Sequence, residues 1–160
     1  MTRASFQITL PSPEATAALA ARIGSMLAPG DVLLLSGGIG AGKTHFARAL
    51  IQSMQDDPEE VPSPTFTLVQ VYDTPKGELW HSDLYRLSHP DEVVELGLID
   101  AFETAICLVE WPDRLNDLAP GNALSLDFAM TDRAGERILT FSVPGREWSD
   151  RLEGVIDAVA

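Results

Sequence analysis

Residues 36–45 read SGGIGAGKTH and combine a glycine-rich turn with a lysine and a hydroxyl side chain. They follow the apolar run 32–35 and satisfy the phosphate-loop pattern GxxxxGK[ST] in full. Glycines let backbone amides close around phosphate oxygens because no side chain stands in the way. Lys43 can reach the β- and γ-phosphates, and the Thr44 hydroxyl can supply one of the hard oxygen ligands that Mg²⁺ prefers. The segment therefore predicts a phosphate cradle for a nucleoside triphosphate.

Two acidic residues are candidates for the carboxylate that such a cradle needs beside its metal. Glu110 ends the apolar run 105–109, and a parallel strand next to the cradle strand would bring it to Mg²⁺ or its water shell. Asp83 also ends a predicted strand, where it could position water or hold the metal through water. The alternatives are a solvated acid at a strand end for Glu110 and a turn or cap residue for Asp83.

The elements that must position these residues follow from periodicity and from turn residues. Alternation and apolar runs predict strands at 6–10, 32–35, 66–72, 78–83, 105–109, 123–128 and 138–143, with hairpins at 66–83 and 123–143. Helices are predicted from the Ser12 cap to before Pro29, over 44–54, over a short stretch ending at Gly97, and over 148–159. We expect one P-loop ATPase domain over residues 1–160. Its class would be α/β, a P-loop NTPase-like mixed sheet, parallel around the P-loop with antiparallel hairpins and with helices on both faces.

Composition indicates a globular chain. It has 160 residues, 45% of them apolar, and a mean hydropathy of +0.04. No apolar run approaches the roughly 20 residues of a membrane span, so we expect no membrane contact. The first residues carry one arginine and no apolar stretch of signal-peptide length, so we expect no export signal. Cys107 is the single cysteine and lies in an apolar run, which predicts a buried thiol. This cysteine usage favours a reducing compartment, the cytoplasm.

The charge balance restricts the partners. The chain carries 24 acidic and 11 basic residues, a formal net charge of −13. Such a surface repels a phosphate backbone, so direct tight nucleic-acid binding is not expected. Docking on a basic patch of another protein remains open, and solubility is the simpler interpretation.

The class of nucleotide follows from what the sequence lacks. It holds no Asn-Lys-x-Asp or Thr-Lys-x-Asp guanine reader, which favours ATP over GTP. A small-molecule kinase is the rival, and it should carry lid arginines that clamp phosphates. Arg133 and Arg137 flank Gly135 and are the only nearby pair, with ordinary surface charges as the other interpretation.

Four stretches in order carry a family resemblance: GAGKT at 40–44, SPTFTLV at 63–69, HSDLYRL at 81–87 and LVEWP at 108–112. Together they closely resemble the TsaE family, also called YjeE. These are the bacterial ATPases that help install threonylcarbamoyladenosine on tRNAs reading codons that begin with A. The resemblance is strong from about residue 10 to residue 112 and looser beyond.

The resemblance implies a role for each matching residue. Thr44 and Glu110 would hold Mg²⁺, and the catalytic set would be Lys43, Asp83 and Glu110. Segment 63–67 would act as a switch-like loop near the γ-phosphate, and Gly135 with Arg137 would lie towards adenine. The implied nucleotide-binding set is Gly37, Gly38, Ile39, Gly40, Ala41, Gly42, Lys43, Thr44, His45, Trp111 and Arg137.

The resemblance also implies partners, namely the TsaB and TsaD proteins. Hydrolysis of ATP would reset the TsaB–TsaD complex, and TsaD would carry out the transfer to tRNA. We expect slow turnover by the isolated chain, since no clear arginine finger is present. A nucleotide-gated binding module, in which hydrolysis is incidental, is the alternative from another class.

Three positions depart from the family's usual pattern. The family generally has an acid at Gly38, a threonine at His45 and an aromatic residue at Ser82. We hypothesise that His45 donates to a phosphate oxygen or to a partner, with an ordinary helix-surface histidine as the alternative. His81 and His89 lack metal-ligand spacing and are interpreted as structural.

Overall fold

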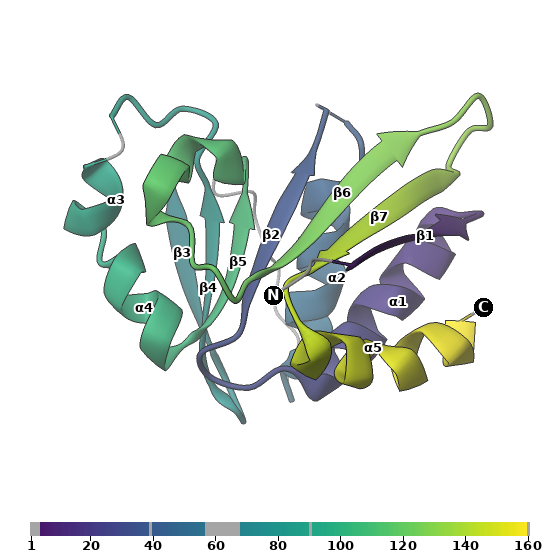
Figure 1. Cartoon of the computed structure of the whole chain (residues 1–160), viewed down its shortest axis with the longest axis horizontal. Coiled ribbons are helices and arrows are strands. Elements are labelled where there is room, and N and C mark those ends of the chain that lie inside the picture. The colour runs from purple at the N-terminus through teal and green to yellow at the C-terminus, as the bar shows by residue number, and fades with distance from the viewer. Residues whose placement is uncertain (1–3, 39, 57–67, 90, 160) are drawn as a thin grey trace.

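The computed structural model describes residues 4–38, 40–56, 68–89 and 91–159, with no account of the side chains at 156–159. The described strands form one seven-stranded sheet in the order β1-β7-β6-β2-β5-β4-β3 (Figure 1). The strands are β1 Ala4–Leu10, β2 Val32–Gly37, β3 Val69–Thr74, β4 Gly77–Asp83, β5 Ile106–Glu110, β6 Leu124–Met130 and β7 Arg137–Val143. The helices are α1 Pro13–Met26, α2 Lys43–Met54, α3 Glu92–Glu95, α4 Leu98–Thr104, α5 Arg146–Val159 and the 3₁₀ helix η1 Pro112–Leu118.

The centre of the sheet is parallel. Strand β2 lies between β5 and β6 and is parallel to both, and β4 is parallel to β5. The pairs β1–β7, β6–β7 and β3–β4 are antiparallel. The predicted mixed sheet, parallel around the phosphate loop and flanked by two hairpins, is therefore confirmed.

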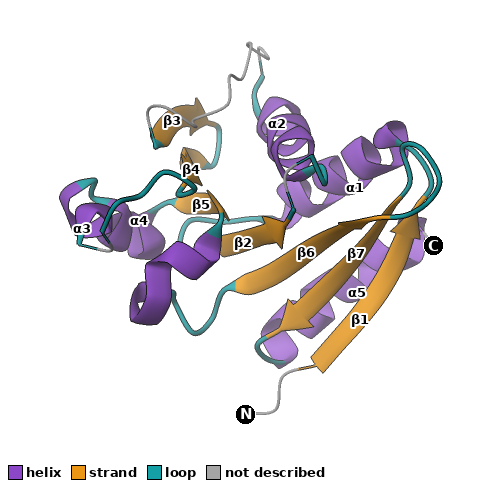
Figure 2. Cartoon of the chain, turned by 90° about the horizontal axis from the view of Figure 1, so that it is seen from above, coloured by secondary structure: helices purple, strands orange, loops and turns teal. Residues whose placement is uncertain are grey.

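Helices cover both faces, as predicted, because the central strands are apolar on both sides. Leu33 and Leu35 of β2 pack in a core shared with α1, α2 and α5, whereas Val32 and Leu34 pack against α4 and η1. Figure 2 shows α1 and α2 on one side of the sheet and α3 and α4 on the other. A strand buried on both faces reads as a continuous apolar run, which is why residues 32–35 show no alternation.

Helix α1 begins as its sequence predicts. The Ser12 hydroxyl accepts a hydrogen bond from the Ala15 amide at 3.1 Å, and Pro13 occupies the first turn. Helix α2 has no such side-chain cap, because Gly42 precedes it. The amides of its first turn therefore have no side-chain acceptor of their own, an arrangement that suits an anion.

The structure corrects the prediction at three places. Gly97 follows α3, as predicted, but it also directly precedes α4, a helix that was not predicted. Its φ of 81° permits the turn between the two helices. The helix η1 was not predicted either. Leu68, predicted to lie within the first strand of the β3–β4 hairpin, has φ of 65°, outside the strand region, and the described strand begins at Val69; Phe66, the predicted start, lies outside the described residues. Ile39 and the switch-like segment 63–67 lie outside the described residues.

None of the helices in the described part of the chain is long and apolar enough to cross a membrane.

Candidate functional site

The phosphate loop joins the end of β2 to the start of α2. Gly37 has φ of 134°, and a Cβ atom there would clash with the carbonyl oxygen of Phe128 on neighbouring β6. Gly42 has φ of 108° directly before α2. Only glycine adopts these conformations freely, so the two glycines determine how tightly the loop turns.

Lys43 is buried at the start of α2. Its ammonium donates to the carbonyl oxygens of Gly37 at 2.5 Å and Gly38 at 3.2 Å, and lies 3.8 Å from the centre of the Trp111 ring. Burial lowers the pKa of the Lys43 ammonium, while the negative charges of Glu110 and Asp83 act in the opposite direction. The loop's own carbonyl groups and an aromatic face surround this charge.

Glu110 meets Thr44 at the carboxyl end of the parallel strands. The register places Leu35 of β2 opposite Glu110 of β5. The Thr44 hydroxyl donates to Oε1 of Glu110 at 2.8 Å, although 66 positions separate the two residues. The parallel neighbour expected from the sequence is therefore present, and its terminal carboxylate is 1% exposed rather than solvated.

Asp83 lies beside Glu110, at the end of the next parallel strand. The two residues are opposite each other in the β4–β5 register. Oδ1 of Asp83 accepts from the Tyr85 amide at 3.0 Å, and the residue is 5% exposed. The turn-residue interpretation thus describes one of its contacts, while its position also brings it to the same edge as Glu110.

Trp111 follows Glu110 with a backbone that few non-glycine residues adopt. Its φ is 58°, and its amide donates to the Leu35 carbonyl at 3.2 Å. The indole ring lies between Lys43 and Tyr85, whose ring centre is 4.8 Å away. Left-handed non-glycine residues concentrate at functional sites, where the surrounding structure holds the strain.

These side chains surround one cavity of about 250 Å³. The sequence-predicted residues Lys43, Thr44, Asp83, Glu110 and Trp111 all lie on its wall. The full lining is Gly40, Lys43, Thr44, Asp83, Tyr85, Arg86, Glu110 and Trp111.

His45 and Arg137 belong to a second cavity, of about 180 Å³, which is also lined by Gly42 and Gly135. Arg137 donates to the carbonyl groups of Ala41 at 2.8 Å and Gly40 at 3.3 Å, so it braces the phosphate loop. Nε2 of His45 lies 3.0 Å from the Pro13 carbonyl oxygen. A carbonyl only accepts, so Nε2 carries the proton and is committed to α1 rather than directed at the first cavity.

The oxygen donors of the first cavity fit a magnesium ion bound together with phosphates. Among the described residues, no cluster of three His, Cys, Asp or Glu side chains could hold a metal by itself. Mg²⁺ usually takes one or two carboxylates plus phosphate oxygens and water instead. The Thr44 hydroxyl and the Glu110 carboxylate, in contact at 2.8 Å, offer such a partial set.

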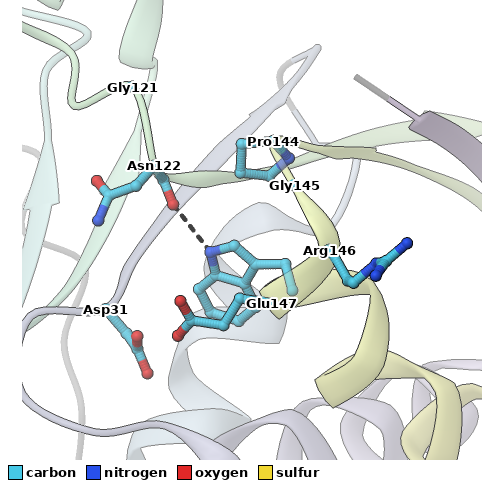
Figure 3. A pocket seen from close by; sticks show the side chains of 8 residues that line it. Asp31, Gly121, Asn122, Pro144, Gly145, Arg146 and Glu147 are labelled. Carbon is cyan, nitrogen blue, oxygen red and sulfur yellow. Dashed lines mark hydrogen bonds between the residues drawn. The ribbon is translucent and has the colours of Figure 1, made fainter. Parts of the chain in front are cut away.

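A larger cavity of about 510 Å³ lies where β2 and β6 begin, at the other end of β2 from the phosphate loop. Figure 3 shows the residues that line it. Its walls include Asp31 before β2, Asn122 before β6 and Glu147 of α5. The indole nitrogen of Trp148 donates to the Asn122 carbonyl at 2.8 Å. No residue of the phosphate loop lines it, so its size does not make it the candidate site.

A comparison with protein families adds an independent observation to this geometry. The family model described as "Threonylcarbamoyl adenosine biosynthesis protein TsaE" matches residues 10–139. The chain belongs to the TsaE family. The resemblance drawn from the four sequence stretches is thereby confirmed.

Individual TsaE relatives match along most of their length. The tRNA threonylcarbamoyladenosine biosynthesis protein TsaE of Rickettsia bellii (strain RML369-C) is 36% identical over 126 residues, covering 79% of this chain and 88% of the relative. The protein of the same name from Bacillus subtilis (strain 168) is 36% identical over 140 residues, covering 86% and 85%. The crystal structure of Bacillus subtilis YdiB superposes with a TM-score of 0.79 at 28% identity, covering 100% of this chain and 99% of that one. The fold is the P-loop NTPase fold expected of the TsaE family.

Sequence reasoning missed three side chains of this TsaE-family site. Tyr85 and Arg86 line the first cavity, and His81 contacts Glu110. All three belong to the stretch HSDLYRL at 81–87, one of the four stretches that carry the family resemblance. The period of two along β4 places His81 on the same face as Asp83, and that signal could have identified it.

The departures from the TsaE pattern have different settings. No atom lies within 4 Å of a Cβ built at Gly38, so a side chain there would meet open space. Ser82 is fully buried, and its hydroxyl has no hydrogen-bond partner in the described part of the chain. Nothing in the structure explains why Ser82 replaces an aromatic residue.

Proposed function

We propose that this chain is a Mg²⁺-dependent ATPase of the machinery that installs threonylcarbamoyladenosine at position 37 of tRNA. It acts on a complex of TsaB and TsaD and does not grip tRNA itself. Membership of the TsaE family supports a role in the biosynthesis of threonylcarbamoyladenosine. The phosphate-loop sequence supports the binding of a nucleotide. The acidic surface, with a net charge of −13, supports action through protein partners rather than on nucleic acid.

The observation that carries this proposal is the convergence of Lys43, Thr44 and Glu110 on one cavity. Three separate requirements of a nucleotide–magnesium site meet there: a cation, a hydroxyl ligand and a buried carboxylate. An ordinary glycine-rich turn needs none of the three. Asp83, one strand further on, adds a second carboxylate to the same wall.

The residues have distinct tasks during hydrolysis. Lys43 leaves the carbonyl groups of Gly37 and Gly38 and donates to oxygens of the β- and γ-phosphates, which stabilises the charge of the transition state. Glu110 keeps the Thr44 hydroxyl oriented through the 2.8 Å hydrogen bond. Asp83 accepts a hydrogen bond from the attacking water and so orients it. Thr44 and Glu110 would hold Mg²⁺, which would neutralise part of the phosphate charge.

The base and sugar of ATP extend beyond the first cavity, which at about 250 Å³ is small for a whole nucleotide. The adjoining cavity, with Gly135, Arg137 and His45 on its wall, receives the adenine side. Arg137 supports this region indirectly, because its guanidinium is bonded to carbonyl groups of the phosphate loop.

The proposal is tested by measuring phosphate release from ATP and equilibrium binding of ATP. We expect Mg²⁺-dependent release by the wild type, slow alone and faster with TsaB–TsaD. Lys43→Met should lower turnover on the order of 10²-fold or more, because it removes a donor to the transition state. Arg133→Met is the matched control, since Arg133 lies outside both cavities. Equal turnover by the wild type and Lys43→Met would contradict the proposal.

The Glu110→Gln variant separates an ATPase from a nucleotide-gated binding module. If the variant binds ATP and the partners but supports only one round of modification, hydrolysis resets the complex. If it supports repeated rounds, binding of ATP is sufficient without hydrolysis, and the chain is a nucleotide-gated binding module. A small-molecule kinase would instead transfer labelled phosphate to an acceptor, and detection of such a product would displace the ATPase proposal.

A further inference from the structure

His81 is a fully buried polar side chain that the proposed hydrolysis does not use. It lies on β4, opposite Leu108 of β5, and its side chain is on the face of the sheet that α2 covers. Its neighbours on that face along β4 are Leu79 and Asp83. An apolar residue would suit this position if packing were its only purpose.

The imidazole contacts the carboxylate that the proposed function assigns to the metal. Nε2 of His81 lies 2.6 Å from Oε2 of Glu110, while Oε1 of the same carboxylate accepts from the Thr44 hydroxyl at 2.8 Å. An ionised carboxylate only accepts hydrogen bonds, so Nε2 carries the proton. Glu110 is therefore held at both oxygens by one donor on β4 and one on α2.

The other ring nitrogen of His81 indicates that a histidine at this position lowers the stability of the fold. Nδ1 of His81 is buried without a hydrogen-bond partner among the described residues. A buried polar atom without a partner destabilises a fold, and such atoms call for an explanation other than stability. The explanation available within reach of the ring is the Glu110 carboxylate.

We propose that His81 is a positioning residue, which holds the Glu110 carboxylate by its Oε2 atom so that Oε1 stays directed at Thr44 and the metal. The proposal rests on the proposed function, because it specifies what orients the metal-binding carboxylate. The terminal torsion of a glutamate side chain is broad, so the direction of the Glu110 carboxylate depends on the hydrogen bonds at its two oxygens. Residues that orient metal ligands typically change metal affinity or activity 10–100-fold when they are removed.

The test compares two substitutions of His81 that differ in one donor. In His81→Gln the amide nitrogen can take the place of Nε2, whereas His81→Leu fills the space without a donor. The probe is Mn²⁺ titrated into the protein–ADP complex, with free Mn²⁺ followed by electron paramagnetic resonance. We expect the leucine variant to bind Mn²⁺ about 10–100-fold more weakly. The glutamine variant should stay within about threefold of the wild type, and ADP affinity in EDTA should be unchanged in both.

One further measurement and one reserve variant strengthen the test of His81. Long-range ¹H–¹⁵N correlation spectra of the nucleotide-free protein should show His81 protonated at Nε2, and this signal should shift in Glu110→Gln. If the leucine variant does not fold in urea titrations, His81→Asn replaces it. Its shorter amide ends near the Nδ1 position and cannot reach Glu110, so it should also bind Mn²⁺ weakly.

The possible failures are distinguishable. Wild-type protein that binds neither ADP nor Mn²⁺–ADP would overturn the nucleotide site, and the role of His81 with it. Wild-type binding with equal Mn²⁺ affinity in the leucine, or asparagine, variant would overturn the positioning role alone. Equal weakening by glutamine and leucine would also overturn it, because a structural role does not distinguish the donor.

Discussion

At the scale of single residues, the candidate site contains a few side chains and glycines with specific local contacts. A Cβ atom at Gly37 would meet a backbone carbonyl oxygen, and the buried Lys43 ammonium donates to a carbonyl group of the loop. Glu110 is held by hydrogen bonds at both carboxylate oxygens. Each contact is local, so each can be tested by one substitution.

Gly37→Ala tests the phosphate-loop geometry. The added Cβ would clash with the Phe128 carbonyl oxygen, and φ of 134° is unfavourable for alanine. We expect the free energy of unfolding to fall by about 2 kcal/mol or more, and nucleotide binding to be lost. Gly38→Ala is the control, since no atom lies within 4 Å of its Cβ position, and it should change stability by less than about 0.5 kcal/mol. Urea unfolding of both variants measures the difference, and similar losses would contradict the steric argument.

Cys107 provides a prediction about pH. Burial raises the pKa of its thiol from 9.0 to about 12. The unfolded chain loses this proton near pH 9, whereas the folded protein keeps it, so the free energy of unfolding should fall as pH rises above 9. Cys107→Ala should flatten this fall. In native protein at pH 8, a thiol reagent should react only at the rate of unfolding, and rapid labelling would contradict the burial.

At the scale of elements, one arginine of α5 contacts both the end of α1 and the residue just before β2. Arg151 of α5 donates to both carboxylate oxygens of Asp31, just before β2, and to the Met26 carbonyl at the end of α1. Its guanidinium also lies 4.1 Å from the centre of the Trp148 ring. Helix α5 is thereby attached near the start of β2, at the opposite end of this strand from the phosphate loop.

Arg151→Ala should weaken this attachment. The ion pair is only partly exposed, with 21% of the arginine and 16% of the aspartate side chain accessible, so solvent screens it incompletely. We expect a loss of about 1–2 kcal/mol in the free energy of unfolding, with little effect on nucleotide affinity. Arg146→Ala, on the exposed start of the same helix, is the matched control and should change stability by less than about 0.5 kcal/mol. Thermal melts at equal salt would reveal the contrast, and its absence would mean that α5 is held by packing alone.

At the scale of the whole molecule, the feature that bears on the proposed partners is charge. A net charge of −13 on 160 residues produces a negative potential over most of the surface. Such a potential discourages contact with tRNA and favours a basic protein surface. The net charge therefore bears on solubility and on association with partners rather than on the fold.

The association rate with TsaB–TsaD should depend strongly on ionic strength. Screening of long-range attraction should lower the rate constant about tenfold or more between low and high salt. The dissociation rate should change much less, because short-range contacts determine it. Stopped-flow measurements across a sodium chloride series would check both rates. An association rate that is independent of salt would show that the acidic surface serves solubility only.

The sequence by itself determined the parts of this protein that depend on neighbouring residues. The phosphate loop, Lys43 and Thr44 are consecutive, and their chemistry follows from glycine conformations and the start of a helix. Apolar runs and turn residues predicted every strand of the sheet, and Glu110 was identified because it ends such a run. The start of α4 escaped prediction, since Gly97 can both end one helix and precede another.

Only the tertiary structure decided which distant residues meet. The order β6-β2-β5-β4 brings Glu110 to Thr44 and places Asp83 beside Glu110. It also directs His81, which was interpreted as structural from the sequence, towards the Glu110 carboxylate. Arg137 reaches the loop carbonyl of Ala41 across 96 positions of sequence. Strand order and register result from burying both faces of the sheet at once. That is a property of the whole core, and no local pattern records it.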